Sequence, residues 1–175
     1  MSHITNVFQP QRYTGFWYQI ARIPFYWDQD CVGATAEYYM LPNGNIRLVN
    51  TCLQEDGSSY TRTGEAQEAD DYHNGHLEIR FTDGLPSDTN NEQIPEAIKA
   101  LLGNQSQAEQ RWAPYWVHWT DYVNYSIVGS PDKSYLWILS RCPTIPKEDL
   151  YKLTCYIKEM GYDLEKIIID TDKIN

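Results

Sequence analysis

The stretch 120–125, Thr-Asp-Tyr-Val-Asn-Tyr, and the stretch 135–141, Tyr-Leu-Trp-Ile-Leu-Ser-Arg, decide the fold together with Gly15-Phe16-Trp17. Each stretch is short and carries little information by itself. Between them, apolar and polar residues alternate with the period of β-strands, and an amphipathic helix follows. In this order and spacing they predict a closed antiparallel barrel, which with about eight strands is wide enough for one small ligand.

The strands can be placed because turn residues separate them. A helix should begin at Pro146 and end before Gly161, with Leu150, Leu153, Ile157 and Met160 on the face that packs against the outside of the barrel. The sequence therefore predicts an all-β fold, an eight-stranded up-and-down antiparallel barrel with one C-terminal α-helix packed outside. The expected strands span residues 13–24, 32–41, 45–53, 59–69, 76–82, 115–121, 125–129 and 135–141, with a short last strand at 166–170.

Length and charge limit the function classes. The 175 residues suit a single domain, 1–175, and the net charge of −10 with a pI near 4.7 argues against a nucleic-acid partner. No apolar run approaches the roughly 18 residues of a membrane-spanning helix. Residues 1–11 lack the apolar core of a signal peptide. The protein is therefore cytoplasmic if Met1 is the native start, and otherwise a secreted, periplasmic or membrane-associated mature domain.

Residues 84–112 interrupt the regular alternation of strands and short turns between the fifth and the sixth strand. The segment is rich in Asn, Gln and Ser and contains one short helical piece, Pro95 to Leu102. Because it lies at the end of the barrel opposite Gly15 and Asp121, it is predicted to be an insertion at the open end. A lid with Ile94, Ile98, Leu101 and Leu102 as its apolar face and a disordered excursion are equally compatible with the sequence.

Four cysteines, Cys31, Cys52, Cys142 and Cys155, allow three pairings and fit no zinc pattern. The turn at 43–44 would pair residue 31 with about residue 56 in a regular ladder. A direct bond between Cys31 and Cys52 therefore requires the chain to bend before its strand begins. The sequence is therefore compatible with a disulfide and with free thiols.

The three motifs, in this order and followed by a helix, resemble those of the lipocalins, and within them the branch of apolipoprotein D and the bacterial lipocalins. Gly15-Phe16-Trp17 is similar to the Gly-x-Trp motif, residues 120–125 to the Thr-Asp-Tyr-x-x-Tyr turn, and Arg141 stands where the third motif has an arginine. The resemblance implies that Trp17 lies under the Arg141 guanidinium at the closed end, in a cation–π contact. Asp121 suits a tight turn in which its carboxylate accepts backbone N–H groups.

Alternation assigns one face of each strand to the interior, because polar residues such as Glu37, Arg47 and His118 should take the outer face. For the last strand, the resemblance supplies the assignment. Tyr38, Asn50 and Tyr135 would be the polar groups of a mostly apolar lining. The predicted ligand-binding residues are Ala34, Ala36, Tyr38, Ile46, Leu48, Asn50, Leu77, Ile79, Phe81, Tyr115, Val117, Trp119, Tyr135, Trp137 and Leu139.

Such a lining suits an elongated apolar ligand with one polar group, and the resemblance implies a fatty acid, a lysophospholipid or a steroid-like lipid. The predicted function is binding and transport of this ligand. The alternatives are a carrier of a carotenoid or bilin pigment, and a protein-interaction module with a filled barrel. Peripheral association with a membrane and a monomeric or dimeric state both stay open.

An enzyme is not expected. Ala34 stands where lipocalin-like prostaglandin isomerases have a cysteine, and no Ser-His-Asp arrangement converges on the interior. We therefore predict no catalytic residues and no cofactor. His73 and His76 beside Asp70 and Asp71 have the residue types of a metal site, but a solvated polar turn explains them better, and no metal site is predicted.

Overall fold

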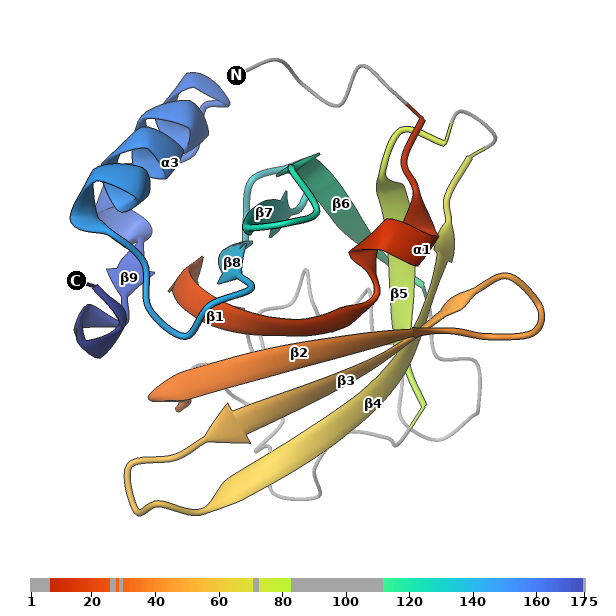
Figure 1. Ribbon diagram of the computed structural model, residues 1–175, viewed down its shortest axis with the longest axis horizontal. Helices are drawn as coiled ribbons and strands as arrows, with labels where there is room; N and C mark the ends of the chain where they lie inside the picture. Colours follow the sequence, from red (N-terminus) through yellow and green to blue (C-terminus); the bar gives the residue numbers. More distant parts are fainter. Residues whose placement is uncertain (1–6, 26–27, 29, 71–72, 83–111, 175) are drawn as a thin grey trace.

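The computed structural model describes residues 7–25, 28, 30–70, 73–82 and 112–174 and shows a closed antiparallel barrel (Figure 1). Consecutive strands pair from β2 to β8, and β1 pairs with both β2 and β8, which closes the sheet on itself. The predicted fold class is confirmed. The barrel strands are β1 (Gly15–Ile23), β2 (Gly33–Met40), β3 (Ile46–Leu53), β4 (Ser59–Glu68), β5 (His76–Phe81), β6 (Ala113–Thr120), β7 (Tyr125–Gly129) and β8 (Leu136–Ser140).

Short elements follow the barrel at the C-terminal end of the chain. The strand β9 (Ile168–Ile169) pairs with β1 outside the closed ring, at the position where the sequence predicts a short last strand. It lies between two 3₁₀ turns, η1 (Leu164–Lys166) and η2 (Thr171–Lys173). The chain thereby adds a ninth strand to the sheet without opening the barrel.

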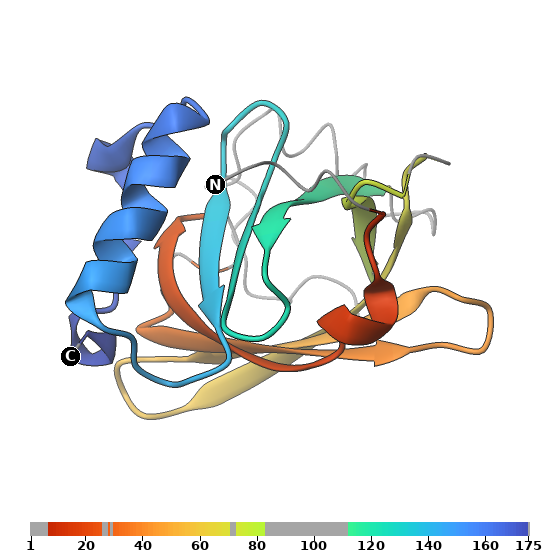
Figure 2. The same cartoon turned by 45° about the horizontal axis from the view of Figure 1, so that its top comes forward.

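The helix α3 (Lys147–Glu159) packs outside the barrel, as predicted, and Figure 2 shows it beside β1 and β8. Pro146 precedes it and Gly161, with φ of +88°, follows it, a conformation that glycine adopts without strain. Its buried residues Leu150, Leu153 and Ile157 join Ile20, Ile127 and Ile138 of the barrel wall in one hydrophobic cluster. The amphipathic pattern therefore placed both the helix and its buried face correctly.

The short helix α1 (Pro10–Tyr13) was not predicted, because four residues carry no periodicity. It precedes β1 at the closed end, where the Arg141 guanidinium lies 3.7 Å from the centre of the Trp17 ring. Arg141 also donates hydrogen bonds to the carbonyl oxygens of Phe16 (3.0 Å) and Arg12 (3.1 Å). The expected cation–π contact is confirmed, and the same guanidinium ties α1 to the barrel.

The turn between β6 and β7 is organised by Asp121, as expected. Its Oδ1 accepts hydrogen bonds from the backbone N–H groups of Val123 (3.0 Å), Asn124 (2.7 Å) and Tyr125 (2.9 Å). Partial burial disfavours the charged carboxylate, but these hydrogen bonds outweigh it, so the pKa of Asp121 is lowered. The Asp121 carboxylate is therefore ionised at neutral pH, and in this form it holds the turn.

The inward placement of Trp119 was wrong. The β6–β7 register runs from Val117–Val128 directly to Trp119–Ile127, so His118 is an extra residue in a β-bulge. Beyond the bulge the alternation changes phase, and Trp119 packs edge-to-face on Tyr156 of α3, with 6.3 Å between ring centres. A bulge is a feature of strand pairing, and a single strand's alternation does not reveal it.

The predicted insertion of residues 84–112 lies outside the described residues apart from Trp112, and so do its expected lid residues Ile94, Ile98, Leu101 and Leu102. Trp112, just before β6, lies under the Arg80 guanidinium, 4.6 Å from the ring centre. The lid remains a sequence-based prediction.

Candidate ligand-binding site

The barrel interior holds a hydrophobic cluster separate from the one beneath α3. Its wall is aliphatic on β3 and β5, and it combines an aromatic with an aliphatic side chain on β6 and on β8. Alternation predicts these inner faces on β3, β5 and β6, and the family resemblance predicts the one on β8. Three aromatic residues, Phe8, Tyr13 and Trp17, occupy the closed end, with 5.2 Å between the ring centres of Tyr13 and Trp17. The interior is therefore closed at this end, and its lining is mostly apolar, with Asn50 and Arg62 as buried polar exceptions.

Most of the predicted site residues lie in this cluster. Three others share its face: Phe81 packs against it partly exposed, Asn50 is buried opposite Ala36, and Ala34 is half-buried opposite Cys52. Their contact with a ligand remains a prediction. The residues found within the cluster are Ala36, Tyr38, Ile46, Leu48, Leu77, Ile79, Tyr115, Val117, Tyr135, Trp137 and Leu139.

Two of the three expected polar groups are already hydrogen-bonded within the wall. The hydroxyls of Tyr38 and Tyr115 bond to each other, and the Tyr135 hydroxyl donates to the carbonyl oxygen of Pro114. Burial raises the pKa of Tyr38 and Tyr115 well above the ordinary tyrosine value, so both phenols stay neutral. Of the three, only Asn50 keeps an acceptor, its Oδ1, without a hydrogen-bond partner among the described residues.

Several interior residues were missed. Phe8 and Tyr13 precede the first predicted strand segment or lie at its edge, and Phe25 follows that strand, so alternation said nothing about them. Ala66 and Arg62 are different, because they lie on β4, whose inner face was never assigned. Thr61, Thr63 and Glu65 alternate with Gly64 and Ala66, which would have placed Ala66 inward, and the same phase extends to Arg62.

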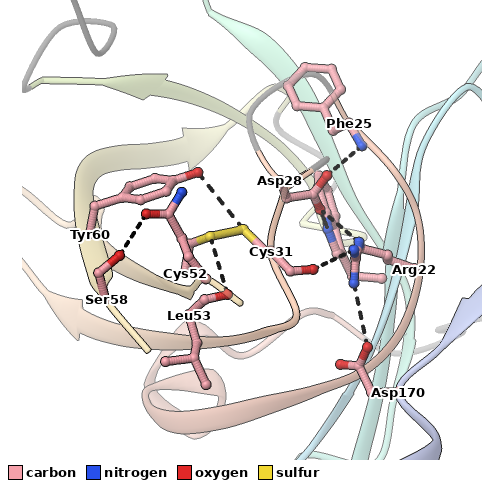
Figure 3. Close-up of a disulfide and its surroundings, with 11 residues drawn as sticks. Arg22, Phe25, Asp28, Cys31, Cys52, Leu53, Ser58, Tyr60 and Asp170 are labelled. Atoms are coloured by element: carbon pink, nitrogen blue, oxygen red, sulfur yellow. Dashed lines mark hydrogen bonds and ion pairs between the residues drawn. A yellow bond between two sulfur atoms is a disulfide. The ribbon is translucent and has the colours of Figure 1, made fainter. Parts of the chain in front are cut away.

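At the open end, the disulfide between Cys31 and Cys52 joins the β1–β2 loop to β3, as Figure 3 shows. The two Cα atoms are 5.4 Å apart. The regular ladder ends at Gly33–Leu53, and the backbone N–H of Val32 still donates to Leu53, so the chain bends at this point. The sequence left open whether Cys31 and Cys52 form a disulfide, and the structure shows that they do, with the bend that this pairing requires.

A buried ionic cluster lies beside the disulfide (Figure 3). Arg22 of β1 donates to the carbonyl oxygen of Cys31 (2.7 Å) and to Asp170 (3.4 Å), and its Nε lies 4.0 Å from Asp28. Asp28 in turn accepts hydrogen bonds from the Trp137 indole (2.8 Å) and the Phe25 N–H (2.7 Å). The cluster therefore connects the β1–β2 loop to the interior wall and to the C-terminal segment.

The rim next to the disulfide carries a hollow of about 520 Å³ that is distinct from the apolar interior. Its lining includes three acidic residues, Asp30, Glu55 and Asp56, together with Cys31, Val32 and Gln54. An acidic, polar-lined hollow does not suit an apolar ligand, so we place the candidate site in the barrel interior instead.

The polar turn between β4 and β5 shows ordinary surface contacts. His73 hydrogen-bonds to Glu68, and the His76 ring stacks on Trp116 with 3.8 Å between ring centres. Within the described ranges, no three His, Cys, Asp or Glu side chains gather in a way that could hold a metal ion. In the same ranges, no helix is long and apolar enough to cross a membrane.

Comparisons with known proteins agree with this geometry. A model of the lipocalin-like domain matches residues 8–98 and 91–172. Apolipoprotein D from Mus musculus is 30% identical over 176 residues, which cover 96% of this chain and 78% of the relative. The outer membrane lipoprotein Blc from Vibrio cholerae is 26% identical over 164 residues, 92% of this chain and 81% of the relative.

Solved structures show the same fold at lower identity. Insecticyanin from Manduca sexta superposes with a TM-score of 0.66 at 20% identity, covering 97% of this chain and 83% of its own. Lobster apocrustacyanin A1 gives 0.60 at 18% identity, with 91% and 77% covered. With its family model, relatives and barrel in agreement, the chain belongs to the lipocalin-like family, whose members bind small hydrophobic ligands.

Proposed function

We propose that this lipocalin binds an elongated single-chain lipid, such as a fatty acid or a lysophospholipid, inside the barrel and carries it through water. The observation that supports this most is the interior lining, which is mostly apolar from Trp17 at the closed end to Trp137 near the mouth, with Asn50 and Arg62 as polar exceptions. Cavities with continuous apolar walls and few polar groups hold ligands mainly by burial of apolar surface.

Small residues on the inner face of β2 support a site that a chain can enter. Ala36 is buried, whereas Ala34, one inward-facing position nearer the mouth, is half-buried. Partial exposure of an inner-face residue is what an interior that opens at this end would give. The tyrosine hydroxyls of the wall are bonded to one another or to the backbone, so they do not oppose an apolar chain.

We also propose that the protein works outside the cytoplasm. The disulfide between Cys31 and Cys52 supports this, because such bonds form and persist mainly in oxidising compartments. The name of the Vibrio cholerae relative, an outer membrane lipoprotein, is compatible with the same location.

Native mass spectrometry of the purified protein, before and after organic extraction, tests the proposed cargo. We expect an extractable adduct of lipid mass, and uptake of long-chain fatty acid by the extracted protein. A coloured adduct would contradict the proposal in favour of a pigment. No adduct and no uptake would contradict it in favour of a filled barrel that binds a protein.

Substitutions on the two faces of β2 distinguish ligand binding inside the barrel from binding on its outer surface. Ala34→Phe places a ring on the inner face near the mouth and should weaken fatty-acid binding by about tenfold or more, because it occupies the path of the chain. The adjacent Thr35→Phe, on the outer face, is the matched control and should bind like the wild type. Equal binding by both variants would place the ligand outside the barrel. Calorimetric titration gives the affinities.

A further inference from the structure

The inner face of β3 carries a buried polar acceptor, the side-chain amide oxygen of Asn50. Asn50 lies between the inward-facing residues Leu48 and Cys52, and only 8% of its surface is exposed. Its Oδ1 is buried and accepts no hydrogen bond from any part of the chain that the structure describes. Buried acceptors without a donor are uncommon in folded proteins and costly, so this oxygen indicates a missing donor.

The neighbours of Asn50 explain why the wall leaves this oxygen unpaired. Ala36, directly opposite on β2, ends in a methyl group, and Leu48 is aliphatic. Cys52 has no S–H group, because its sulfur is bound in the disulfide. Arg62, opposite on β4, carries N–H donors, but none of them bonds to this oxygen. The described wall therefore offers an acceptor without a donor, and a bound molecule can supply the donor.

The depth of Asn50 decides which part of a lipid would reach it. Cys52, two residues further along β3, carries the disulfide at the mouth, and two residues of a strand span about 7 Å. In the other direction, Leu48 and Ile46 continue the apolar wall towards the closed end. A polar group that meets Asn50 would therefore lie inside the barrel, with the chain below it and any larger headgroup at the mouth.

The amide oxygen requires a ligand group that donates a hydrogen bond. An ionised carboxylate has only acceptors, so a fatty acid at neutral pH does not satisfy it, whereas a hydroxyl group donates. A lysophospholipid has such a hydroxyl on its glycerol, between the chain and the phosphate headgroup. This is the order of groups that the depth of Asn50 requires.

We propose that Asn50 accepts a hydrogen bond from the free glycerol hydroxyl of a single-chain lysophospholipid. The chain then runs along Leu48 and Ile46, and the phosphate headgroup lies towards the mouth. The proposal rests on the proposed function, because it selects one of the lipid classes named there for the same interior. It adds that the site discriminates against the same lipid when this hydroxyl is absent or capped.

The first test uses wild-type protein and three phosphocholine lipids with the same tetradecyl chain on glycerol. The middle glycerol carbon carries a hydroxyl, a hydrogen or a methoxy group. In calorimetric titrations below micelle-forming concentrations, the hydroxyl lipid should bind about tenfold more tightly than the other two, because only it pairs with Oδ1. The hydrogen-bearing (deoxy) lipid separates the lost hydrogen bond from the bulk of the methoxy group. Equal affinities of the hydroxyl and deoxy lipids would refute the role of Asn50 and leave the lipid function standing.

The second test uses variants of β3. Asn50→Leu removes the acceptor, so it should lower the affinity for the hydroxyl lipid about tenfold and leave that for the deoxy lipid nearly unchanged. Thr51→Val is the matched control, because it removes a hydrogen-bonding group from the outer face of the same strand, where Thr51 bonds to Thr61. It should keep the wild-type preference for the hydroxyl lipid.

Loss of folding, of selectivity and of lipid binding can be told apart in this series. Thermal unfolding checks each variant, and Asn50→Ala replaces Asn50→Leu if the latter does not fold. A folded Asn50 variant that keeps the wild-type ratio of hydroxyl to deoxy affinity would show that Asn50 does not bind the hydroxyl. Wild-type binding of myristic acid but of none of the three phosphocholine lipids would rule out the lysophospholipid. Failure to bind any of the four ligands would overturn the lipid function itself.

Discussion

Asp28 and Asp170, the two carboxyls that face Arg22, show how burial changes a single residue. Burial disfavours their charged forms and raises the pKa of each to about 6, although the Arg22 charge acts in the opposite direction. Asp172 and Lys173 also act on Asp170, raising and lowering its pKa respectively. Both carboxyls therefore titrate well above the acidic range of exposed aspartates.

The sign of the resulting pH dependence follows from linkage. A carboxyl whose pKa is higher in the folded protein binds more protons there, so its contribution to stability grows as the pH falls from about 7 towards 4. We expect Asp170 to add on the order of 1 kcal/mol between pH 7 and pH 5. Asp121 has a lowered pKa, so it stabilises the folded protein at neutral pH. This stabilisation is lost as the pH falls below the unfolded pKa near 3.9.

Urea unfolding of the wild type and Asp170→Asn at several pH values between about 7 and 5 checks this. The stability of the wild type relative to the variant should rise on acidification across this range. A difference that stays constant would show that Asp170 titrates at an ordinary pKa. A carbon NMR titration of the aspartate carboxyls measures the same pKa directly.

At the scale of elements, α3 covers the part of the wall formed by β1, β7 and β8. Leu153 is buried in the same hydrophobic cluster as Ile20 and Ile138 of the barrel wall. Tyr151, two residues earlier on the same helix, is 70% exposed. The helix is therefore held by one apolar face, and its other face contributes little to the fold.

Leu153→Ala should lower the free energy of unfolding by about 3 kcal/mol, because it removes buried methyl groups and leaves a cavity. Tyr151→Ala, the control on the same helix, should change it by less than about 0.5 kcal/mol. Chemical denaturation of both variants measures the difference. Similar losses for the two would mean that α3 packs through another face.

At the scale of the whole molecule, the disulfide joins two residues that are 21 positions apart and ties Cys31, just before β2, to β3 at the open end. The same β1–β2 loop carries Asp28, which bonds to Trp137 in the interior wall. The covalent bond and the buried ionic cluster thus act on one loop. They tie Cys31 and Asp28 of this loop to the barrel wall.

Replacing both Cys31 and Cys52 by alanine should lower stability by about 3 kcal/mol, as expected for a closed loop of this length. Cys142→Ala, which removes an exposed free thiol, is the control and should leave stability unchanged. Urea unfolding without reductant measures both. Equal stability of the double variant and the wild type would show that the bond does not constrain the unfolded chain.

The sequence by itself determined the barrel, its strand order, the outer helix and most of the inner face. These follow from the period of two along strands, from turn residues and from one helical stripe, all of which are local patterns. The inner face of the last strand is the exception, because it was assigned from the family resemblance. The Trp17–Arg141 contact was expected from the family resemblance, and Asp121 as a turn residue from its own chemistry.

Only the tertiary structure decided features that depend on pairing between strands. The bulge at His118 turns Trp119 outwards, and the bend before Gly33 brings Cys31 to Cys52. The position of Arg62 beside Asn50 depends on the β3–β4 register in the same way. Local patterns do not specify such features, because a register or a bulge is fixed by contacts between residues that are distant in the chain.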